Sequence, residues 1–376
     1  MSTARVCPVD LTSRDTYLGG IPHEVFTQLR RERPIHWHET ERGGYWALTK
    51  HADIRAVSRD TDTYSSAAQG VFYEAQGALE GSLLTADPPE HTRLRKAIDG
   101  QFTAHAVTIL EPWLRATAQE IMAEAATKTE CDFVYDLAAR LPLLTICELM
   151  AVPPEDRPRL LDLGDQIIRA PDVAAIQQAM IALGGYGLEL ARERRGGDGD
   201  DLVSIMTRST FEDRPLTDGE LAGQFMQVAI AANETTRTLL SCVALELAAR
   251  PALFAELKAD PGLLPLAVEE FLRWVSPIYY MRRTATRRSE IRGQTIEAGD
   301  AVVMYYASAN RDEDVFAEPD RLDIRRQPNP HLAFGVGRHS CLGSALARLE
   351  ARVFLQTFFE TFSRIELAGD PVRLSR

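Results

Sequence analysis

The sequence lacks the features that would direct attention to a membrane or a secretion pathway. No run approaches the roughly 20 apolar residues that a membrane-spanning helix needs. The first residues, MSTARVCPVDLT, contain neither a charged leader nor an apolar stretch. Internal repeats and low-complexity tracts are also absent. We therefore expect a soluble, cytoplasmic protein with no membrane contact.

The sequence also has few cysteines and no excess of positive charge. The five cysteines are odd in number and follow no framework spacing, so we expect no disulfides and a reducing compartment. The formal net charge of −12 argues against nucleic acid as a general partner. With 376 residues and 45% apolar content, the chain can bury a large core. We expect one domain over residues 1–376 and a monomer.

Most of the chain has the apolar periodicity of helices. The pattern predicts helices over residues 22–33, 51–59, 107–127, 137–150, 156–170, 173–195 and 264–274. Short strands are expected at residue 37, at 45–48 on the far side of the Gly43-Gly44 turn, and at 281–286, 290–296 and 301–306. Residues 61–85 are too irregular for either period and too apolar for a solvated linker, which is typical of a functional loop.

A long central helix is predicted from Thr217 to about Arg250. Thr217 and Glu220 have the spacing of a capping box, and Pro251 ends the pattern. Its apolar residues go nearly all the way round, so we expect this helix to be buried. Glu234 and Thr235 lie at its centre. Because burying an unpartnered carboxylate is costly, Glu234 needs either a structural polar partner or a functional role.

Another unusual feature is the glycine-rich loop Phe334-Gly-Val-Gly-Arg-His-Ser-Cys341-Leu-Gly, which comes directly before an amphipathic helix. Glycines let the backbone approach a flat partner closely. The helix N-terminus favours a thiolate, which acts as a metal ligand or a nucleophile. The alternative for Cys341 is a buried cysteine that packs as a small apolar side chain.

The spacing Phe-x-x-Gly-x-His-x-Cys-x-Gly in this loop resembles the haem-binding loop of the cytochrome P450 monooxygenases. The resemblance covers nearly the whole chain and weakens at residues 367–376, before the last hairpin expected in the family. It implies a mainly α cytochrome P450 fold, with a small antiparallel β portion, around one haem b. Cys341 would be the axial thiolate on the iron, His339 a propionate partner, and Phe334 the aromatic residue near the thiolate.

Three further residues would contact haem propionates by the same resemblance. The string Pro-Pro-Glu-His-Thr-x-x-Arg carries His91 and Arg95, four positions apart on a predicted helix. Taken alone, these two residues would be a solvated pair. Arg283 matches another propionate-binding arginine, although its neighbour Arg282 leaves the match open by one position.

The family pattern also assigns chemistry to the central helix. It places an acid and an alcohol that steer protons to the haem on Glu234 and Thr235. Ala232 stands where the family usually has glycine, and its added methyl group would narrow the groove there. Ile230 and Ala231, one turn earlier, together with Tyr279, are expected to contact substrate.

A structural network behind the haem is implied by three other residues. Glu270 and Arg273 match the family's Glu-x-x-Arg, and Arg321 is the arginine of the later Pro-x-Arg segment. A Glu and an Arg three positions apart are also a common surface pair. We expect the three residues to support the cysteine loop rather than to take part in chemistry.

The implied function is oxidation of a mainly apolar small molecule, such as a terpenoid, sterol or other lipid, by dioxygen. The thiolate favours cleavage of the O–O bond, and a ferredoxin-type partner supplies electrons. Two alternatives remain. A peroxide-driven haem-thiolate oxidase usually lacks the acid and the alcohol, which are both present here. A catalytically silent docking member would tend to lose the cysteine.

Overall fold

The structure is a computed structural model that describes residues 9–41, 43–73, 82–169, 172–211 and 214–373. Its contacts divide the chain into two compact units. The first unit comprises residues 1–78, 269–341 and 369–376, and the second comprises residues 79–268 and 342–368. The expectation of one domain over 1–376 stays a prediction.

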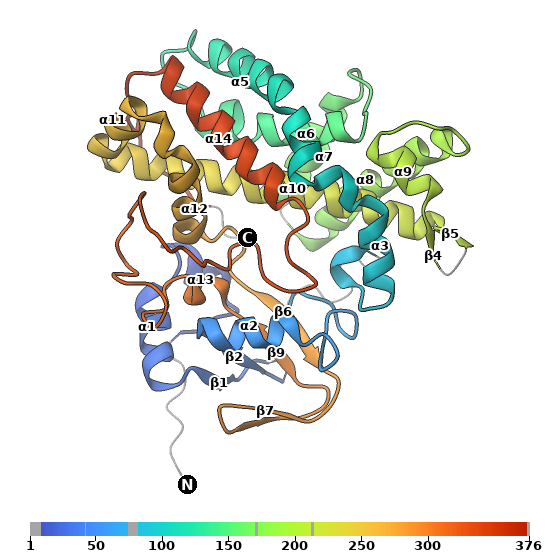
Figure 1. Ribbon diagram of the computed structural model, residues 1–376, viewed down its shortest axis with the longest axis vertical. Coiled ribbons are helices and arrows are strands. Elements are labelled where there is room, and N and C mark those ends of the chain that lie inside the picture. Colours follow the sequence, from blue (N-terminus) through green and yellow to red (C-terminus); the bar gives the residue numbers. More distant parts are fainter. Residues whose placement is uncertain (1–8, 42, 74–81, 170–171, 212–213, 374–376) are drawn as a thin grey trace. The chain divides into compact units, whose positions relative to one another are not determined.

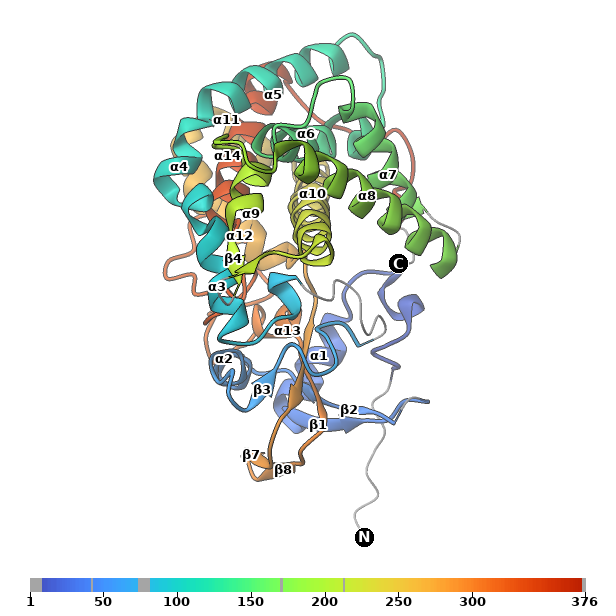
Figure 2. The same cartoon turned by 90° about the vertical axis from the view of Figure 1, so that its right-hand side faces the viewer.

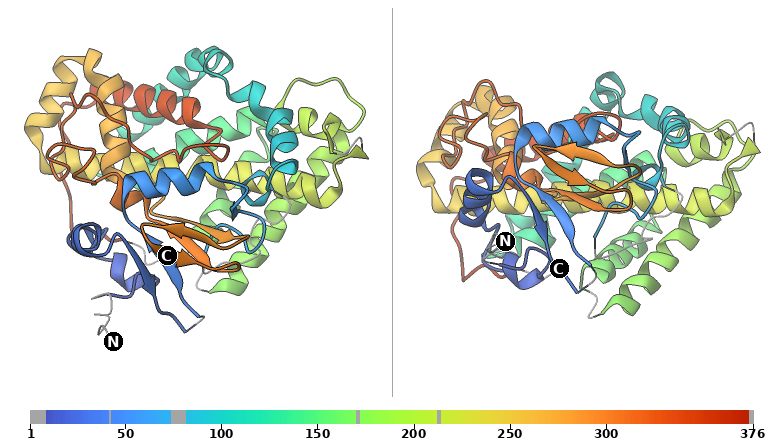
Figure 3. Two further views of the ribbon diagram at one scale, coloured as in Figure 1. Left: turned by 60° about the horizontal axis from the view of Figure 1, so that its bottom comes forward. Right: turned by 90° about the horizontal axis from the view of Figure 1, so that it is seen from below.

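A five-stranded sheet forms the frame of the first unit. Its order is β1 (Ile35–His38), β2 (Tyr45–Leu48), β9 (Ala301–Met304), β6 (Met281–Ala285) and β3 (Tyr64–Ser65). Figure 3 shows the blue strands of the N-terminal part beside the orange strands β6 and β9. A separate hairpin, β7 (Ser289–Ile291) and β8 (Gln294–Ile296), turns at Gly293, so the single strand expected over 290–296 is divided in two.

One strand pairing differs from the expected antiparallel arrangement. β2 pairs with β9 in parallel, with Ala47 opposite Val303, whereas the other pairings in the sheet are antiparallel. A parallel pair needs a long crossover connection, and about 250 residues of chain separate these two strands. Because local sequence patterns do not report on such distant partners, the sequence did not indicate this pairing.

Short helices complete the first unit. They are α1 (His23–Glu32), α2 (His51–Arg59), α13 (Tyr306–Ala309) and the last turns of α12 (Leu264–Val275). α13 packs against both α1 and α2 (Figure 1). The buried side chains of Ile54, Val57 and Val302 join α2 and the sheet in one core cluster, and Val336 of the cysteine loop packs against it. The cysteine loop is thereby attached to a packed frame.

The second unit is mainly helical. Its helices are α3 (Glu90–Ile98), α4 (Ala104–Ile109), α5 (Glu111–Ala125), α6 (Arg140–Leu149), α7 (Arg157–Arg169), α8 (Val173–Arg194), α9 (Leu202–Arg208), α10 (Asp218–Ala249), α11 (Pro251–Ala259) and α14 (Ser344–Thr361). α10 packs against α6, α8, α11 and α14 (Figure 2). A small hairpin, β4 (Thr210–Phe211) and β5 (Arg214–Pro215), precedes α10.

The predicted start of α10 is confirmed. The Thr217 Oγ1 atom accepts a hydrogen bond from the Glu220 amide, and the Glu220 carboxylate accepts one from the Thr217 amide at 2.7 Å. Arg214 reinforces this cap, because two of its nitrogens donate to the Glu220 carboxylate at 2.8 and 2.9 Å. Arg214 and the capping bonds lower the pKa of Glu220 to about 2. The N-terminus of the central helix is therefore firmly held.

The mainly α fold class is confirmed, as are the helices expected in α1, α2, α6, α7, α8 and α12. The helix expected over 107–127 is interrupted instead, since α4 ends at Ile109 and α5 starts at Glu111 with Pro112 in its first turn. Among the described residues, no single helix is long and apolar enough to cross a bilayer. α10 and α11 reach that length and composition only together, and they are bent by 109°.

Candidate active site

The cysteine loop of the first unit has a defined backbone that depends on two glycines. Gly335 and Gly337 have φ angles of +62° and +84°, in the region that side chains disfavour. A Cβ atom on Gly337 would lie 2.7 Å from the Ser58 carbonyl oxygen at the end of α2, so only glycine fits there. The Cys341 amide donates to the Phe334 carbonyl at 2.8 Å. This bond closes the loop and leaves Cys341 exposed.

Neighbouring side chains hold both ends of this loop. His339 Nε2 lies 3.2 Å from the Ser66 hydroxyl. The Phe334 ring lies 6.0 Å from the ring of His331, whose Nε2 is 3.1 Å from a carboxylate oxygen of Glu269. The loop therefore presents Cys341, His339 and Phe334 from a fixed backbone, and their roles toward haem remain proposals.

The two candidate propionate-binding arginines on β6 are both buried but have different surroundings. Arg282 donates to the side chain and the carbonyl of Gln69 and lies over the Tyr73 ring at 5.8 Å. Burial lowers the pKa of Arg282. Arg283 is 4% exposed, and its guanidinium donates to the Arg282 carbonyl at 2.7 Å. The two arginines thus differ in their partners, and the propionate role of Arg283 stays a prediction.

Glu270 and Arg273 form a completely buried ion pair, with two hydrogen bonds of 2.7 and 2.8 Å and no exposed side-chain surface. Arg273 also donates to the carbonyl oxygens of Asn310 and Pro319, both at 2.8 Å. The Glu270 carboxylate further accepts the Asp323 amide at 2.8 Å. The pair therefore fixes residues 310–323, the segment that leads toward the cysteine loop.

The prediction for Arg321 is wrong in one respect. Its backbone carbonyl accepts from Arg273 at 3.1 Å, but its side chain is exposed and pairs with Glu318 at 3.0 Å. The second guanidinium at Glu270 belongs to Arg326, whose Nε lies 3.1 Å from Oε2. The segment has no regular secondary structure, so residue spacing does not indicate which arginine turns inward.

In the second unit, Glu234 and Thr235 are adjacent on α10 but have different partners. The Glu234 carboxylate accepts a hydrogen bond from Arg237, one turn later. The Thr235 hydroxyl donates to the Ala231 carbonyl at 2.9 Å. Arg237 is the partner that a carboxylate in this largely apolar helix requires. Its position three residues after Glu234 is the spacing at which two side chains on a helix can pair.

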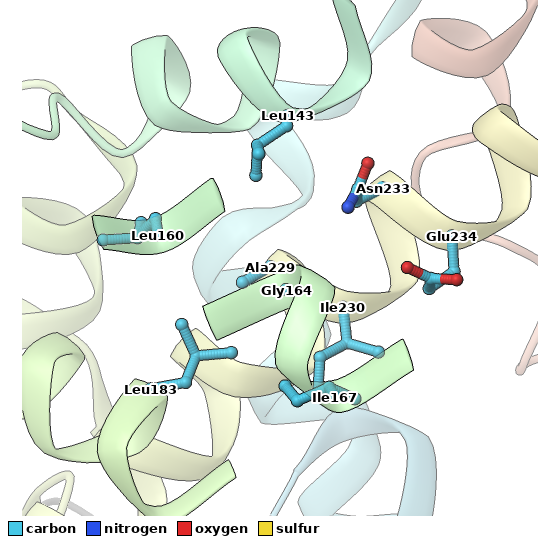
Figure 4. A pocket seen from close by; sticks show the side chains of 9 residues that line it. All are labelled: Leu143, Leu160, Gly164, Ile167, Leu183, Ala229, Ile230, Asn233 and Glu234. Carbon is cyan, nitrogen blue, oxygen red and sulfur yellow. The ribbon is translucent and has the colours of Figure 1, made fainter. Parts of the chain in front are cut away.

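A small cavity lies between α10 and the helices α6, α7 and α8 (Figure 4). Ile230, Asn233 and Glu234 line it from α10, so Ile230 shares a surface with the acid. Ala231, the other residue expected at the substrate, is exposed on the helix and lies one turn before Thr235. Ile230 thus lies beside Glu234, whereas Ala231 lies beside Thr235, so the two residues expected to contact substrate face different surroundings.

The remaining candidates lie in their predicted elements. His91 and Arg95 are one turn apart on α3, and His91 is buried whereas Arg95 is half-buried. Tyr279, in the first unit, stacks on Tyr17 with 5.4 Å between ring centroids. The expected loop over 61–85 contains β3 and a short 3-10 helix, Leu83–Thr85, while residues 74–81 lie outside the described residues.

The donor set fits haem better than a metal held by protein alone. Across the ranges that the structure describes, no three His, Cys, Asp or Glu side chains gather as metal ligands. A metal bound by Cys341 would therefore take its other ligands from a prosthetic group, as haem iron does. The exposed thiol, the glycine backbone beside it and the buried Arg283 suit a flat, anionic macrocycle.

Comparisons with known proteins agree with this geometry. Residues 262–374 match the family model for cytochrome P450. A methyl-branched lipid omega-hydroxylase from Mycobacterium tuberculosis is 36% identical over 93% of this chain and 87% of the relative. A steroid C26-monooxygenase from Mycolicibacterium smegmatis is 34% identical over 94% of this chain and 87% of the relative. The chain belongs to the cytochrome P450 family.

A solved structure confirms the cytochrome P450 fold. The Mycobacterium marinum cytochrome P450 in complex with pseudoionone superimposes with a TM-score of 0.87 and 35% identity, over 95% of this chain and 93% of that one. The family implies a haem cofactor, a substrate, oxygen and a redox partner, and the named relatives are a hydroxylase and a monooxygenase. The sequence motifs point to this family, but they do not show that Arg237 pairs with Glu234 or that Arg326 contacts Glu270.

Proposed function

We propose that this cytochrome P450 uses haem b to insert oxygen into a mainly apolar small molecule of the terpenoid, sterol or lipid type. The observation that carries the proposal is the presence, in one chain, of the cysteine loop and of the Glu234–Thr235 pair on α10. The named relatives act on a steroid and on a methyl-branched lipid, and the solved neighbour holds pseudoionone. These three molecules are largely hydrocarbon.

The residues of the chain have distinct proposed roles. Cys341 ligates the iron, and the haem supplies oxygen activation when bound. His91, Arg95, Arg283 and His339 hold its propionates, while Phe334 packs beside the thiolate. The Glu270–Arg273 pair holds the segment leading toward the cysteine loop in place.

Glu234 and Thr235 transfer protons in this proposal. Arg237 holds the Glu234 carboxylate, and the Thr235 hydroxyl rests on the Ala231 carbonyl, from which it can turn to another acceptor. An acid beside an alcohol provides a general-acid route for protons. A peroxide-driven oxidase has no need for such a pair, which is why we favour dioxygen and an external reductant.

Electrons come, in this proposal, from an acidic ferredoxin-type protein. Arg338 is exposed in the cysteine loop, and Arg348 and Arg352 are four residues apart on α14. Arg352 is partly neutralised, because it lies 3.3 Å from Glu111. Arg348 donates to the Ser344 carbonyl at 3.4 Å, and both arginines of α14 are candidates for contact with an acidic partner. A monomeric state and a cytoplasmic location remain predictions from the sequence.

The proposal is tested by spectral titration of the haem-loaded protein with matched ligands. Terpenoids, sterols and branched fatty acids should displace the iron-bound water and shift the Soret band. Sugars, short peptides and polyamines of similar size serve as controls and should not. A panel in which only the strongly polar ligands shifted the band would refute the substrate class. Product formed with dioxygen and reductant, but not with peroxide alone, would support the monooxygenase over the oxidase.

A further inference from the structure

A hydrogen bond joins the central helix to the segment that leads into α3. The Gln227 Oε1 atom of α10 accepts the Leu84 amide at 3.0 Å. The two residues are 143 positions apart in the sequence, and both belong to the second unit. Leu84 lies in the short 3-10 helix Leu83–Thr85, which packs against both α10 and α3. The Gln227–Leu84 hydrogen bond therefore fixes the segment before α3 onto the central helix.

The Leu84 amide has a physical need for this acceptor. The first amides of a helix have no partner inside the helix, so an oxygen from elsewhere must accept them. The residues beside Leu84 are packed, because Ser82 and Leu83 are both buried. The Thr85 amide donates to the Ser82 carbonyl at 3.2 Å and closes the turn. Gln227 supplies the acceptor for Leu84, so this packed turn is attached to α10 through a side chain.

Gln227 lies on the open side of α10. Gln227, Ala231 and Thr235 follow one another at intervals of four residues, so they share one side of the helix. Ala231 is exposed although it lies near the middle of a helix with many buried residues. The described residues thus leave this side of α10 open at Ala231. It is the side that carries Thr235, one of the two residues proposed to transfer protons.

The Gln227–Leu84 hydrogen bond lies at a defined distance from Thr235 along this open side. Gln227 precedes Thr235 by eight residues, which at 1.5 Å per residue is about 12 Å along the helix axis. Leu84 is half-buried at the far end of that interval. A ligand whose reacting carbon lies beside Thr235 and which extends along α10 toward Gln227 therefore meets Leu84 after about 12 Å.

We propose that Gln227 is a positioning residue for substrate selection, because by holding Leu84 in place it limits the length of ligand that fits beside Thr235. The inference rests on the proposed function, in which a mainly apolar molecule is oxidised. Short ligands fit between Thr235 and Leu84 while the hydrogen bond is intact. A longer ligand fits only if the Gln227–Leu84 hydrogen bond breaks and the segment before α3 moves away from α10.

Two variants at Gln227 separate the hydrogen bond from the size of the side chain. Gln227→Met removes the acceptor but keeps a side chain of similar length. Gln227→Glu keeps an oxygen that can accept the Leu84 amide. Methionine and glutamate are both good helix formers, so α10 should be preserved in either variant. The matched control is Gln224→Met, the same substitution about one turn earlier on α10. Gln224 is buried, and its side-chain amide has no hydrogen-bond partner among the described residues.

Hydrogen exchange of the Leu84 amide reports on the hydrogen bond itself. It is measured on the haem-loaded, ligand-free protein by mass spectrometry at single-residue resolution. Leu84 should exchange about two- to tenfold faster in Gln227→Met than in the parent, which is the effect of one lost hydrogen bond. In Gln227→Glu and in Gln224→Met the Leu84 amide should exchange as slowly as in the parent.

Spectral titration with a short and a long apolar ligand, a monoterpenoid and a sterol, measures the effect on ligand selection. In Gln227→Met the ratio of the two Kd values should shift about two- to tenfold in favour of the sterol, because the segment no longer resists displacement by the longer molecule. Gln224→Met should keep the ratio of the parent.

The proposal is overturned if the Leu84 amide exchanges equally fast in the parent and in Gln227→Met. Faster exchange with an unchanged ratio of Kd values also overturns it, since the hydrogen bond would then not limit ligand length. Failure of the proposed function gives a different result. In that case no terpenoid, sterol or branched lipid shifts the Soret band of the parent, while the exchange rates of Leu84 can still be compared.

Discussion

The Thr236 hydroxyl donates a hydrogen bond to the Glu350 carboxyl group at 3.3 Å and so joins α10 to α14 inside the second unit. Glu350 is fully buried, and burial raises its pKa to about 7 although Thr145 and Thr236 donate to it. Both partners are uncharged hydroxyl groups. Near neutral pH this carboxyl group is therefore poised between its neutral and ionised forms, in contact with the residue that follows Thr235.

Glu350 should make stability depend on pH. Its pKa rises from 4.5 to about 7 on folding, so the folded state binds the proton more tightly. Below pH 4.5 the Glu350 carboxyl group is protonated in both the folded and the unfolded states. As the pH rises from 4.5 to above 7, the free energy of unfolding falls. The loss is roughly 3 kcal/mol, at about 1.4 kcal/mol for each pKa unit. In Glu350→Gln this dependence should disappear.

The measurement is denaturant unfolding of the haem-loaded protein at a series of pH values from 4.5 to 8.5. Exposed Glu130 provides the control variant, Glu130→Gln, whose curve should run parallel to that of the parent. If the curves of the parent and of Glu350→Gln were also parallel, the buried carboxyl would not titrate in this range.

The network around Glu270 predicts that substitutions of two arginines, five residues apart, lower the free energy of unfolding by very different amounts. Arg326→Ala removes a guanidinium that contacts the completely buried Glu270 and three backbone carbonyls. It should lower the free energy of unfolding by about 2 to 4 kcal/mol. Arg321→Ala removes only an exposed pair with Glu318 and should cost less than about 1 kcal/mol. Equal effects of the two variants, by thermal or denaturant unfolding, would contradict the observed contacts.

The contact between Arg326 and Glu270 is a part of the site that the sequence does not predict. The start of α10 follows from its capping residues, and the glycines indicate the tight cysteine loop. The pairing of Glu270 with Arg273 was implied only by the resemblance to the family, because a Glu and an Arg at this spacing are also a common surface pair. The side chain that completes the network lies in a segment with no periodicity, so three arginines at 321, 325 and 326 were equally eligible. The parallel pairing of β2 with β9 and the buried state of Glu350 depend on tertiary packing, which no local pattern reports.

The proton route predicts uncoupling without loss of binding. Thr235→Ala removes the hydroxyl that now donates to Ala231, so haem content and substrate affinity should remain while peroxide is released. Product formed per reductant consumed should fall about tenfold or more. Thr235→Ser keeps the hydroxyl and is the control that should stay close to the parent. Coupling preserved in Thr235→Ala would remove this residue from the proton route.

Docking of an acidic electron donor should depend on Arg348. Arg348→Glu reverses a charge on α14 and should slow partner-supported turnover roughly two- to tenfold, while added salt should slow the parent. Arg208, exposed on α9, provides the control variant Arg208→Glu, which should leave the rate unchanged. Turnover driven by a small-molecule reductant should be equal in all three proteins. Insensitivity to salt and to Arg348→Glu would place the docking face elsewhere.

Thiolate ligation by Cys341 is the central claim, and the spectrum of the reduced carbonyl complex tests it most directly. The parent should show the red-shifted Soret band that a thiolate ligand produces. Cys131→Ser, which changes another exposed cysteine, should keep that band, whereas Cys341→His should bind haem and lose it. A Cys341→His protein that retained the red-shifted band, or a haem-loaded parent that lacked it, would contradict the account.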